Sequence, residues 1–299
     1  AAAAIPELLE QVVALAFVNE TAMGAVHPFL VADQVLGVAP TSTLDWESDE
    51  RFLTHSPPVE AIVLALFENA PAARWCVVTD GSPLGVSVEA AAFEAARLAG
   101  VQRVTLMDVS EDLTAAVSAA ACEQVLVEAV DGFQEKVLAS LPADRIVYRR
   151  AALTPPLESR NDIELSYIDS GPAWNVDAST GMRNFLAALL RHAPDMEPDT
   201  RVREGYVSQL RLHALLEQAV SLGDLRRSNL FSLRQSHQLI DMLGLAEDTD
   251  MSTDQQVFPR SAIVWADNDD QVDADGRGWS LEKLLRPEKF LELASELSN

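Results

Sequence analysis

Short apolar runs alternate with longer amphipathic stretches through the first two-thirds of the chain. The runs are rich in β-branched residues, which is typical of parallel strands covered by helices on both faces. They lie at residues 12–18, 35–38, 75–79, 101–107, 125–130 and 146–148. The stretch at residues 86–99 is expected to form a helix that ends at Gly100, where glycine relieves left-handed strain. The pattern predicts an α/β fold wound around a parallel sheet.

After Trp174 the apolar residues recur at helical spacing instead. One stripe begins at Met182 and a second at Leu212, which predicts two helices that each bury one face. A third helix is expected near residues 226–243.

The last part of the chain is acidic and rich in turn residues from position 248 to 275. Its one apolar run, at residues 262–265, predicts an edge strand. A closing helix is expected over residues 280–297.

A string within this acidic stretch has the spacing of a calcium loop. Its ligand positions are Gln271, Asp273, Asp275 and Glu282. The first ligand is Gln rather than Asp, and Gly278 stands where an aliphatic residue is usual. We therefore favour a solvated acidic turn, and no metal site is predicted.

The net charge of the chain limits the kinds of molecule that it is expected to bind. Of 299 residues, 22 are Lys or Arg and 46 are Asp or Glu, so the formal charge is −24. A polyanion would be repelled, which excludes nucleic acid and favours a small-molecule partner. No apolar run approaches the roughly 20 residues that span a bilayer, so the chain is expected to be soluble.

The two cysteines, Cys76 and Cys122, have no second thiol or histidine at metal-ligand spacing. They are buried packing residues or they pair with each other. Both alternatives stay open from the sequence, and so does the redox compartment.

Candidate binding residues follow the first two strands, because the loops after parallel strands converge on one crevice. Asn19 and Thr21 open a helix after the first strand, and the second strand runs into Thr41, Ser42 and Thr43. Backbone amides and hydroxyls at such points bind a carboxylate or another polar ligand. A plain helix cap and a solvated turn are the alternative interpretations.

Later strands bring Ser82, Asp131 and Arg150 to the same edge. An arginine there can bind a carboxylate through two hydrogen bonds, although surface arginines are common. Ser82 lies in neither a nucleophile elbow nor a dinucleotide fingerprint, and the five histidines are scattered singly. The sequence therefore predicts no catalytic residue and no cofactor, and an enzyme is the least favoured class.

The segment from position 174 to 230 resembles a known family when it is taken as a unit. It contains Trp174, Gly181-Met182, Phe185, Pro194, Pro198, Gly205-Tyr206 and Leu222-Gly223-Asp224-Leu225-Arg226-Arg227. It is similar to the crossover helices of type I solute-binding proteins, the branched-chain amino acid-binding family of ABC transporters. Earlier and later parts of the chain also match the pattern of this family in the same order. They are Pro28, Ala39 to Thr43, Asp80 to Gly85 and Phe258 to Ser261.

The resemblance implies two Rossmann-like lobes with parallel sheets, joined by three crossovers and closing on a small ligand. Lobe I would comprise residues 1–70 and 174–243, and lobe II residues 71–173 and 244–270. Residues 271–299 would form a C-terminal extension. The pattern joins near the third strand of the family, so the opening strands, with any secretion signal or lipid-anchor cysteine, are expected outside this sequence or supplied by another segment.

The ligand contacts of the family would fall largely on the strand-end loops chosen above. They are the loop from Asn19 to Thr21, Thr41, Thr43, the neighbourhood of Leu84, Asp131, Arg150 and Tyr206. Tyr206 rests on the resemblance alone. The family commonly has an aromatic residue, often Tyr, where Leu84 stands, and it has Thr in place of Arg226, so a ligand contact and a helix cap are lost.

The function that the resemblance implies is that of an extracytoplasmic solute-binding protein, in the periplasm or on the cell surface. Such a protein captures a small polar ligand, an amino acid or a related carboxylate, and delivers it to an ABC permease. The alternative is a cytoplasmic sensor that uses the same fold to regulate a partner.

Overall fold

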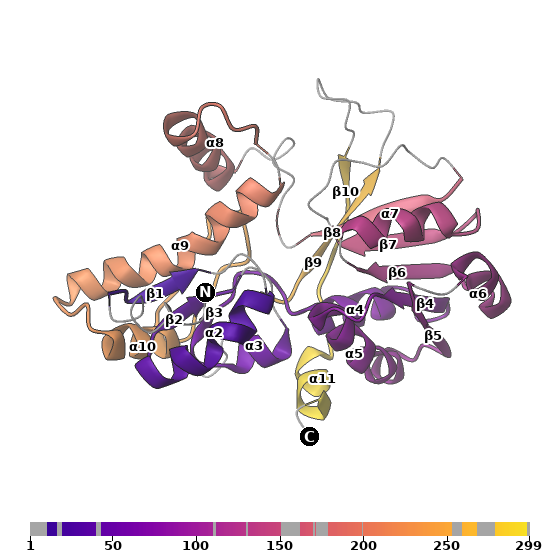
Figure 1. The fold of residues 1–299 in the computed structure, drawn as a ribbon, viewed down its shortest axis with the longest axis horizontal. Coiled ribbons are helices and arrows are strands. Elements are labelled where there is room, and N and C mark those ends of the chain that lie inside the picture. Colours follow the sequence, from indigo (N-terminus) through magenta and orange to yellow (C-terminus); the bar gives the residue numbers. More distant parts are fainter. Residues whose placement is uncertain are drawn as a thin grey trace. The chain divides into compact units, whose positions relative to one another are not determined.

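The computed structural model describes most of the chain. The described residues are 11–16, 20–39, 43–109, 112–129, 131–150, 162–169, 171, 179–198, 200–252, 259–267 and 279–297. They form two compact units: unit 1 is Ala1–Pro58 with Ser170–Pro259, and unit 2 is Val59–Asp169 with Arg260–Asn299 (Figure 1). The chain therefore passes from one unit to the other three times.

Unit 1 is built on a three-stranded parallel sheet of order β1-β2-β3. Its strands are β1 (Ala14–Ala16), β2 (Leu36–Val38) and β3 (Phe52–Leu53), and its helices are α2 (Glu20–Asp33), α3 (Leu44–Ser48), α8 (Thr180–His192), α9 (Thr200–Ser221) and α10 (Arg227–Ser236). Both predicted helices after Trp174 are confirmed. The third ends at Ser236, earlier than predicted.

Alternation along the strands divides the core of unit 1 in two. Leu36, Val38 and Leu53 pack with apolar residues of α8, α9 and α10. Val35 and Phe52 pack with α2 instead. Because successive strand residues point to opposite faces, each face of the small sheet is covered by its own helices.

Unit 2 is built on a seven-stranded sheet of order β10-β9-β8-β7-β6-β4-β5. Its strands are β4 (Arg74–Thr79), β5 (Arg103–Asp108), β6 (Gln124–Glu128), β7 (Ile146–Arg150), β8 (Glu164–Asp169), β9 (Ala262–Asp267) and β10 (Trp279–Leu285). Its helices are α4 (Val59–Asn69), α5 (Pro83–Ala99), α6 (Leu113–Ala120), α7 (Asp131–Ser140) and α11 (Phe290–Leu297). Strands β4 to β8 are parallel, and β9 and β10 each run antiparallel to the preceding strand.

Helices cover both faces of this sheet, as the β-branched runs predicted. On one face Cys76, Val125 and Val147 pack with Val117 of α6 and Val137 of α7. On the other face the ring of Trp75 lies 4.9 Å from Phe67 of α4 and 5.6 Å from Tyr148, measured between centroids. The predicted α/β fold with parallel sheets is confirmed, and α5 ends at Gly100, whose φ is +78°.

Cys76 and Cys122 form a disulfide that joins β4 to the turn before β6, with their Cα atoms 5.7 Å apart. Both residues are buried, at 0% and 2% exposure. Of the two alternatives left open by the sequence, the structure contains the paired one.

The prediction of a closing helix over residues 280–297 was wrong in its first half. Residues 279–285 form β10, and only α11 at the end is helical. Leu281, Leu284 and Leu285 fit helical spacing as well as a strand, but Pro287 excludes a continuous helix through this point. Pairing with β10 also makes β9 an interior strand, whereas an edge strand was expected.

The two units divide the chain differently from the predicted lobes. Helix α4 belongs to unit 2, although residues 1–70 were assigned to lobe I. The C-terminal strand and helix also belong to unit 2 rather than to a separate extension. The Glu68 carboxylate accepts hydrogen bonds from the backbone amides of Glu288 and Lys289, at 2.8 and 3.1 Å, and so holds the start of α11 against α4. No described helix is long and apolar enough to cross a membrane.

Candidate functional site

The carboxyl edge of the sheet in unit 1 carries the first group of predicted contacts. Asn19, Thr41 and Ser42 lie outside the described residues, and so does the side chain of Thr21 in the first turn of α2. Thr43 is buried, and its Oγ1 accepts a hydrogen bond from the backbone amide of Trp46 at 3.4 Å. Its hydroxyl therefore caps helix α3.

The carboxyl edge of unit 2 carries the second group. Ser82 caps α5, since its Oγ accepts from the backbone amide of Gly85 at 3.2 Å. Leu84 is half-buried in the first turn of the same helix. Asp131 begins α7 and Arg150 ends β7, but their side chains lie outside the described part of the structure.

Tyr206, which rested on the resemblance, lies on α9 in unit 1. It is half-buried, and its ring centroid lies 5.5 Å from that of Phe185. The ring thus forms part of the packing between α8 and α9.

The string with calcium-loop spacing lies almost entirely outside the described residues. Gln271 to Gly278 lie outside the described residues, and Glu282 lies within strand β10. Among the described residues no group of three or more His, Cys, Asp and Glu side chains is arranged to hold a metal ion.

One polar cluster at the edge of unit 1 was not predicted. His55 follows β3 directly after Thr54 and is 2% exposed. Its Nε2 lies 2.9 Å from Oε2 of Glu204 on α9. Arg203, which is fully buried, donates to the other carboxylate oxygen of Glu204.

The charge of Glu204 is stabilised by this cluster. Burial raises the pKa of the carboxyl, but the Arg203 guanidinium and the hydrogen bonds from Arg203 and His55 outweigh it and hold the pKa well below its usual range. The carboxylate is therefore ionised at neutral pH.

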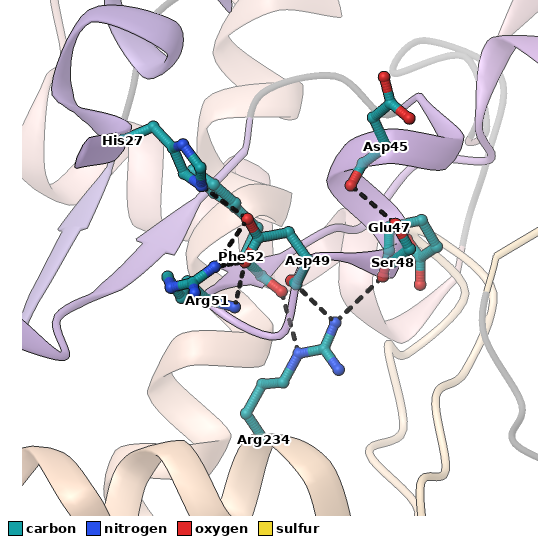
Figure 2. A network of polar contacts seen from close by, with 8 residues as sticks. All are labelled: His27, Asp45, Glu47, Ser48, Asp49, Arg51, Phe52 and Arg234. Atoms are coloured by element: carbon teal, nitrogen blue, oxygen red, sulfur yellow. Dashed lines mark hydrogen bonds and ion pairs between the residues drawn. The ribbon is translucent and has the colours of Figure 1, made fainter. Parts of the chain in front are cut away.

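A second, partly buried network joins the turn between α3 and β3 to α2 and α10 (Figure 2). Arg234 of α10 donates to the carbonyl oxygens of Phe52, Glu47 and Asp49, at 3.1, 3.2 and 3.4 Å. The Asp49 carboxylate accepts from Arg51 at 2.8 Å and contacts His27 Nε2 at 2.7 Å. Because α2, α3, β3 and α10 are all joined here, the end of α3 is held against the start of β3.

Arg211 joins α9 to the end of β3. Its Nη1 donates to the carbonyl of Thr54 at 2.9 Å, and its Nη2 donates to Nε2 of His237 at 3.0 Å. His237 Nδ1 in turn donates to the carbonyl of Gln238 at 2.9 Å. His237 must therefore be neutral, with its proton on Nδ1.

This requirement predicts a loss of stability in mild acid. Burial lowers the pKa of His237 to about 4, and the charges of Arg211 and Arg234 act in the same direction, against the Gln238 carbonyl and Asp250. Below about pH 6.5 this histidine becomes protonated in the unfolded chain but stays neutral in the folded one. The free energy of unfolding therefore falls as the pH drops toward the pKa of His237 in the folded protein. Allowing for solvent screening, we expect a loss of about 1 to 2 kcal/mol between pH 7 and pH 5.

Urea unfolding at several pH values measures this loss. A His237→Gln variant should show a flatter profile over the same interval, because the titrating group is gone. An equal slope in both proteins would assign the effect to other groups.

The carboxyl edge of unit 2 also carries buried polar groups. Thr79 donates to Glu89 of α5. The Arg149 guanidinium carbon lies 4.3 Å from the centroid of the Tyr167 ring. Gln134 of α7 donates to the carbonyl of Ala129 at 2.6 Å. These side chains come from three strands and two helices, so no single local motif in the sequence indicates the group.

Comparison with models of known protein families gives no match, and comparison with curated proteins by sequence gives none either. Solved structures do match. A fatty acid ABC transporter substrate-binding protein from Thermomonospora curvata is 16% identical with a TM-score of 0.77, and the match covers 98% of this chain and 79% of that one. A leucine-binding protein from Thermotoga maritima is 13% identical with a TM-score of 0.70, covering 97% of this chain and 86% of that one.

A third match is a solute-binding protein of an ABC transporter from R. palustris, solved in complex with benzoate. It is 15% identical with a TM-score of 0.66, and the match covers 96% of this chain and 83% of that one. At these identities the likeness concerns the fold, and it runs through nearly the whole chain. The predicted architecture is confirmed: this chain has the type I fold of periplasmic solute-binding proteins.

Proposed function

We propose that this chain is an extracytoplasmic solute-binding protein that captures a small carboxylate and delivers it to an ABC permease. The observation that carries the proposal is the fold, which matches ABC transporter binding proteins over 96 to 98% of the chain. The chain crosses three times between its two α/β units, as the resemblance to this family implies.

The choice of a carboxylate has two supports. The matching proteins are named for fatty acids and leucine or were solved with benzoate, and all of these carry a carboxylate. In this chain the residues proposed for binding at or near strand ends are Asn19, Thr21, Thr41, Ser42, Thr43, Ser82, Leu84, Asp131 and Arg150, and Tyr206 on α9 is proposed from the resemblance. Since the hydroxyls of Thr43 and Ser82 cap helices, we assign their contribution to the amides of the first helical turns, which suit an anion.

The disulfide favours this function over a cytoplasmic sensor. Disulfides persist in oxidising compartments and are rare in the cytosol, where thiols are kept reduced. The pair Cys76–Cys122 is buried in the core of unit 2 and is thus part of the fold. A protein that works in the periplasm or on the cell surface accounts for it directly.

A thermal-shift screen tests the function. The panel contains the twenty protein amino acids, the corresponding carboxylates without the amino group, benzoate and 4-hydroxybenzoate. A ligand at about 30 to 1,000 times its Kd should stabilise the protein by about 2 to 4 kcal/mol and be recovered unchanged. If no member of the panel raises the melting temperature, the proposal is wrong. Chemical conversion of the ligand would indicate an enzyme instead.

An arginine pair serves as the internal control of this screen. Arg150 ends β7 at the carboxyl edge, whereas Arg145 precedes the same strand at its other end. Replacing Arg150 by Met should weaken carboxylate binding at least about tenfold, because a charged hydrogen bond is lost. Replacing Arg145 by Met should leave the affinity unchanged. Equal affinities of both variants would remove Arg150 from the site.

A further inference from the structure

His55 is a buried histidine with one engaged nitrogen. It lies at the carboxyl edge of the sheet in unit 1, two positions beyond the end of β3, and its Nε2 faces Glu204 at 2.9 Å. Its Nδ1 is also buried, and it has no hydrogen-bond partner among the described residues. Buried polar atoms in folded proteins nearly always have a partner, so this nitrogen requires an explanation.

The other fully buried histidine of unit 1 shows what the fold supplies elsewhere. His237 is 1% exposed, and both of its nitrogens are engaged, one by Arg211 and one by the carbonyl of Gln238. Thr54, the neighbour of His55, is likewise occupied, since its hydroxyl donates to Glu47 and its carbonyl accepts from Arg211. Nδ1 of His55 is thus open where these neighbouring groups are engaged, although Nε of Arg211 and Oγ1 of Thr249 are further buried atoms of this unit with no hydrogen-bond partner among the described residues.

The chemistry of the missing partner follows from the proton positions. Glu204 is an ionised carboxylate held by Arg203, so it only accepts hydrogen bonds. Nε2 of His55 must then carry the proton that Glu204 accepts. When the ring carries this one proton only, Nδ1 keeps its lone pair and accepts a hydrogen bond from an N–H or O–H group.

The position of His55 decides where that donor comes from. Ligands of open α/β sheets bind outside the carboxyl ends of the parallel strands, and His55 lies on the segment that leaves β3 at that end. On the first turns of α9, Arg203 binds the carboxylate of Glu204, and this carboxylate binds Nε2 of His55. The two hydrogen bonds fix the orientation of the histidine ring.

We infer that His55 is a ligand-contact residue whose Nδ1 accepts a hydrogen bond from an amino or hydroxyl group of the solute. This rests on the proposed function and narrows it: the solute is a carboxylate that also carries an N–H or O–H donor. Amino acids and hydroxylated aromatic acids satisfy the condition. Plain fatty acids and benzoate do not, because their ionised carboxylate only accepts.

Two substitutions separate the two nitrogens of His55. In glutamine the amide nitrogen is as many bonds from Cβ as Nε2 is, so His55→Gln keeps a donor toward Glu204 and removes the acceptor at Nδ1. In asparagine the amide oxygen corresponds to Nδ1, so His55→Asn keeps the acceptor and removes the donor toward Glu204. His213→Gln, on the exposed side of α9 with 70% of its side chain accessible, is the matched control.

The measurement is the affinity for matched ligands by isothermal titration calorimetry. The pairs are each amino acid against its counterpart without the amino group, and 4-hydroxybenzoate against benzoate. The wild type should prefer the member with the donor, and His55→Gln should lose about tenfold or more for that member alone. His55→Asn should retain more of this preference than His55→Gln, while His213→Gln should behave as the wild type.

The outcomes distinguish this inference from the proposed function. If the wild type binds a carboxylate and His55→Gln binds both members of each pair as the wild type does, Nδ1 is satisfied by a water molecule and the inference is wrong, while the function stands. A wild type that prefers the member without the donor also overturns the inference alone. A wild type that binds no member of the panel overturns both. Should His55→Gln fail to fold, the wild-type preference within the matched pairs and the His55→Asn variant still decide.

Discussion

Replacing Cys76 and Cys122 together by alanine should lower the free energy of unfolding of unit 2 by about 4 kcal/mol. The two cysteines are 46 positions apart in the sequence, and a cross-link that closes a loop of this length removes a large part of the entropy of the unfolded chain. Both sulfur atoms are also buried between β4, β6 and α6, so the variant leaves a small cavity. Both effects act in the same direction.

Urea unfolding of three samples separates the two causes. The oxidised wild type, the wild type under reducing conditions and the double alanine variant differ first in the cross-link and then in the buried sulfur atoms. We expect the larger step between the first two samples. Equal midpoints for the oxidised and the reduced wild type would show that the bond contributes nothing to stability, and free thiols in the denatured, unreduced wild type would show that it does not form.

The parallel core of unit 2 could be predicted because its strands are short β-branched runs between helices. Strands β4, β6 and β7 all fall on predicted runs. Strand β3 was missed since two residues, Phe52 and Leu53, carry no periodicity. Strand β8 was missed because its sequence, Glu-Leu-Ser-Tyr-Ile-Asp, contains no continuous β-branched run, which was the signal used for the other strands.

The candidate site likewise contains residues that could be predicted from the sequence and residues that could not. Thr43 and Ser82 could be found because a hydroxyl before a helix is a local signal, and both do cap helices. The contact of His55 with Glu204 joins residues 149 positions apart. Nothing in either neighbourhood marks the pair, because it exists only once α9 lies against the end of β3.

The buried arginines of unit 1 could not be predicted from the pattern of apolar residues. On α9, positions four apart form the buried face, and it consists of Arg203, Val207, Arg211, Leu215 and Ala219, each at most 1% exposed. The predicted apolar stripe begins only at Leu212, since hydrophobic patterning assigns arginine to the solvent. The first turns of α9 are thereby a polar face within the core. The Arg211 guanidinium binds the carbonyl of Thr54 directly after β3, and the Arg203 guanidinium binds Glu204, which contacts His55.

Replacing Arg211 by methionine should therefore destabilise unit 1 by about 3 kcal/mol, although methionine has a similar length and is apolar. Burial lowers the pKa of Arg211 to about 10, so the guanidinium is charged at neutral pH, and the charge of Glu47 favours this form. Without it, the Thr54 carbonyl and His237 Nε2 lose their donor and the negative charge of Glu47 is less compensated, which costs more than the apolar contacts gain. Arg191→Met, on an exposed position of α8 in the same unit, should change stability by less than about 0.5 kcal/mol and is the matched control in urea unfolding. If the two variants unfold at the same urea concentration, Arg211 fills space and no more, and the polar face of α9 does not hold β3.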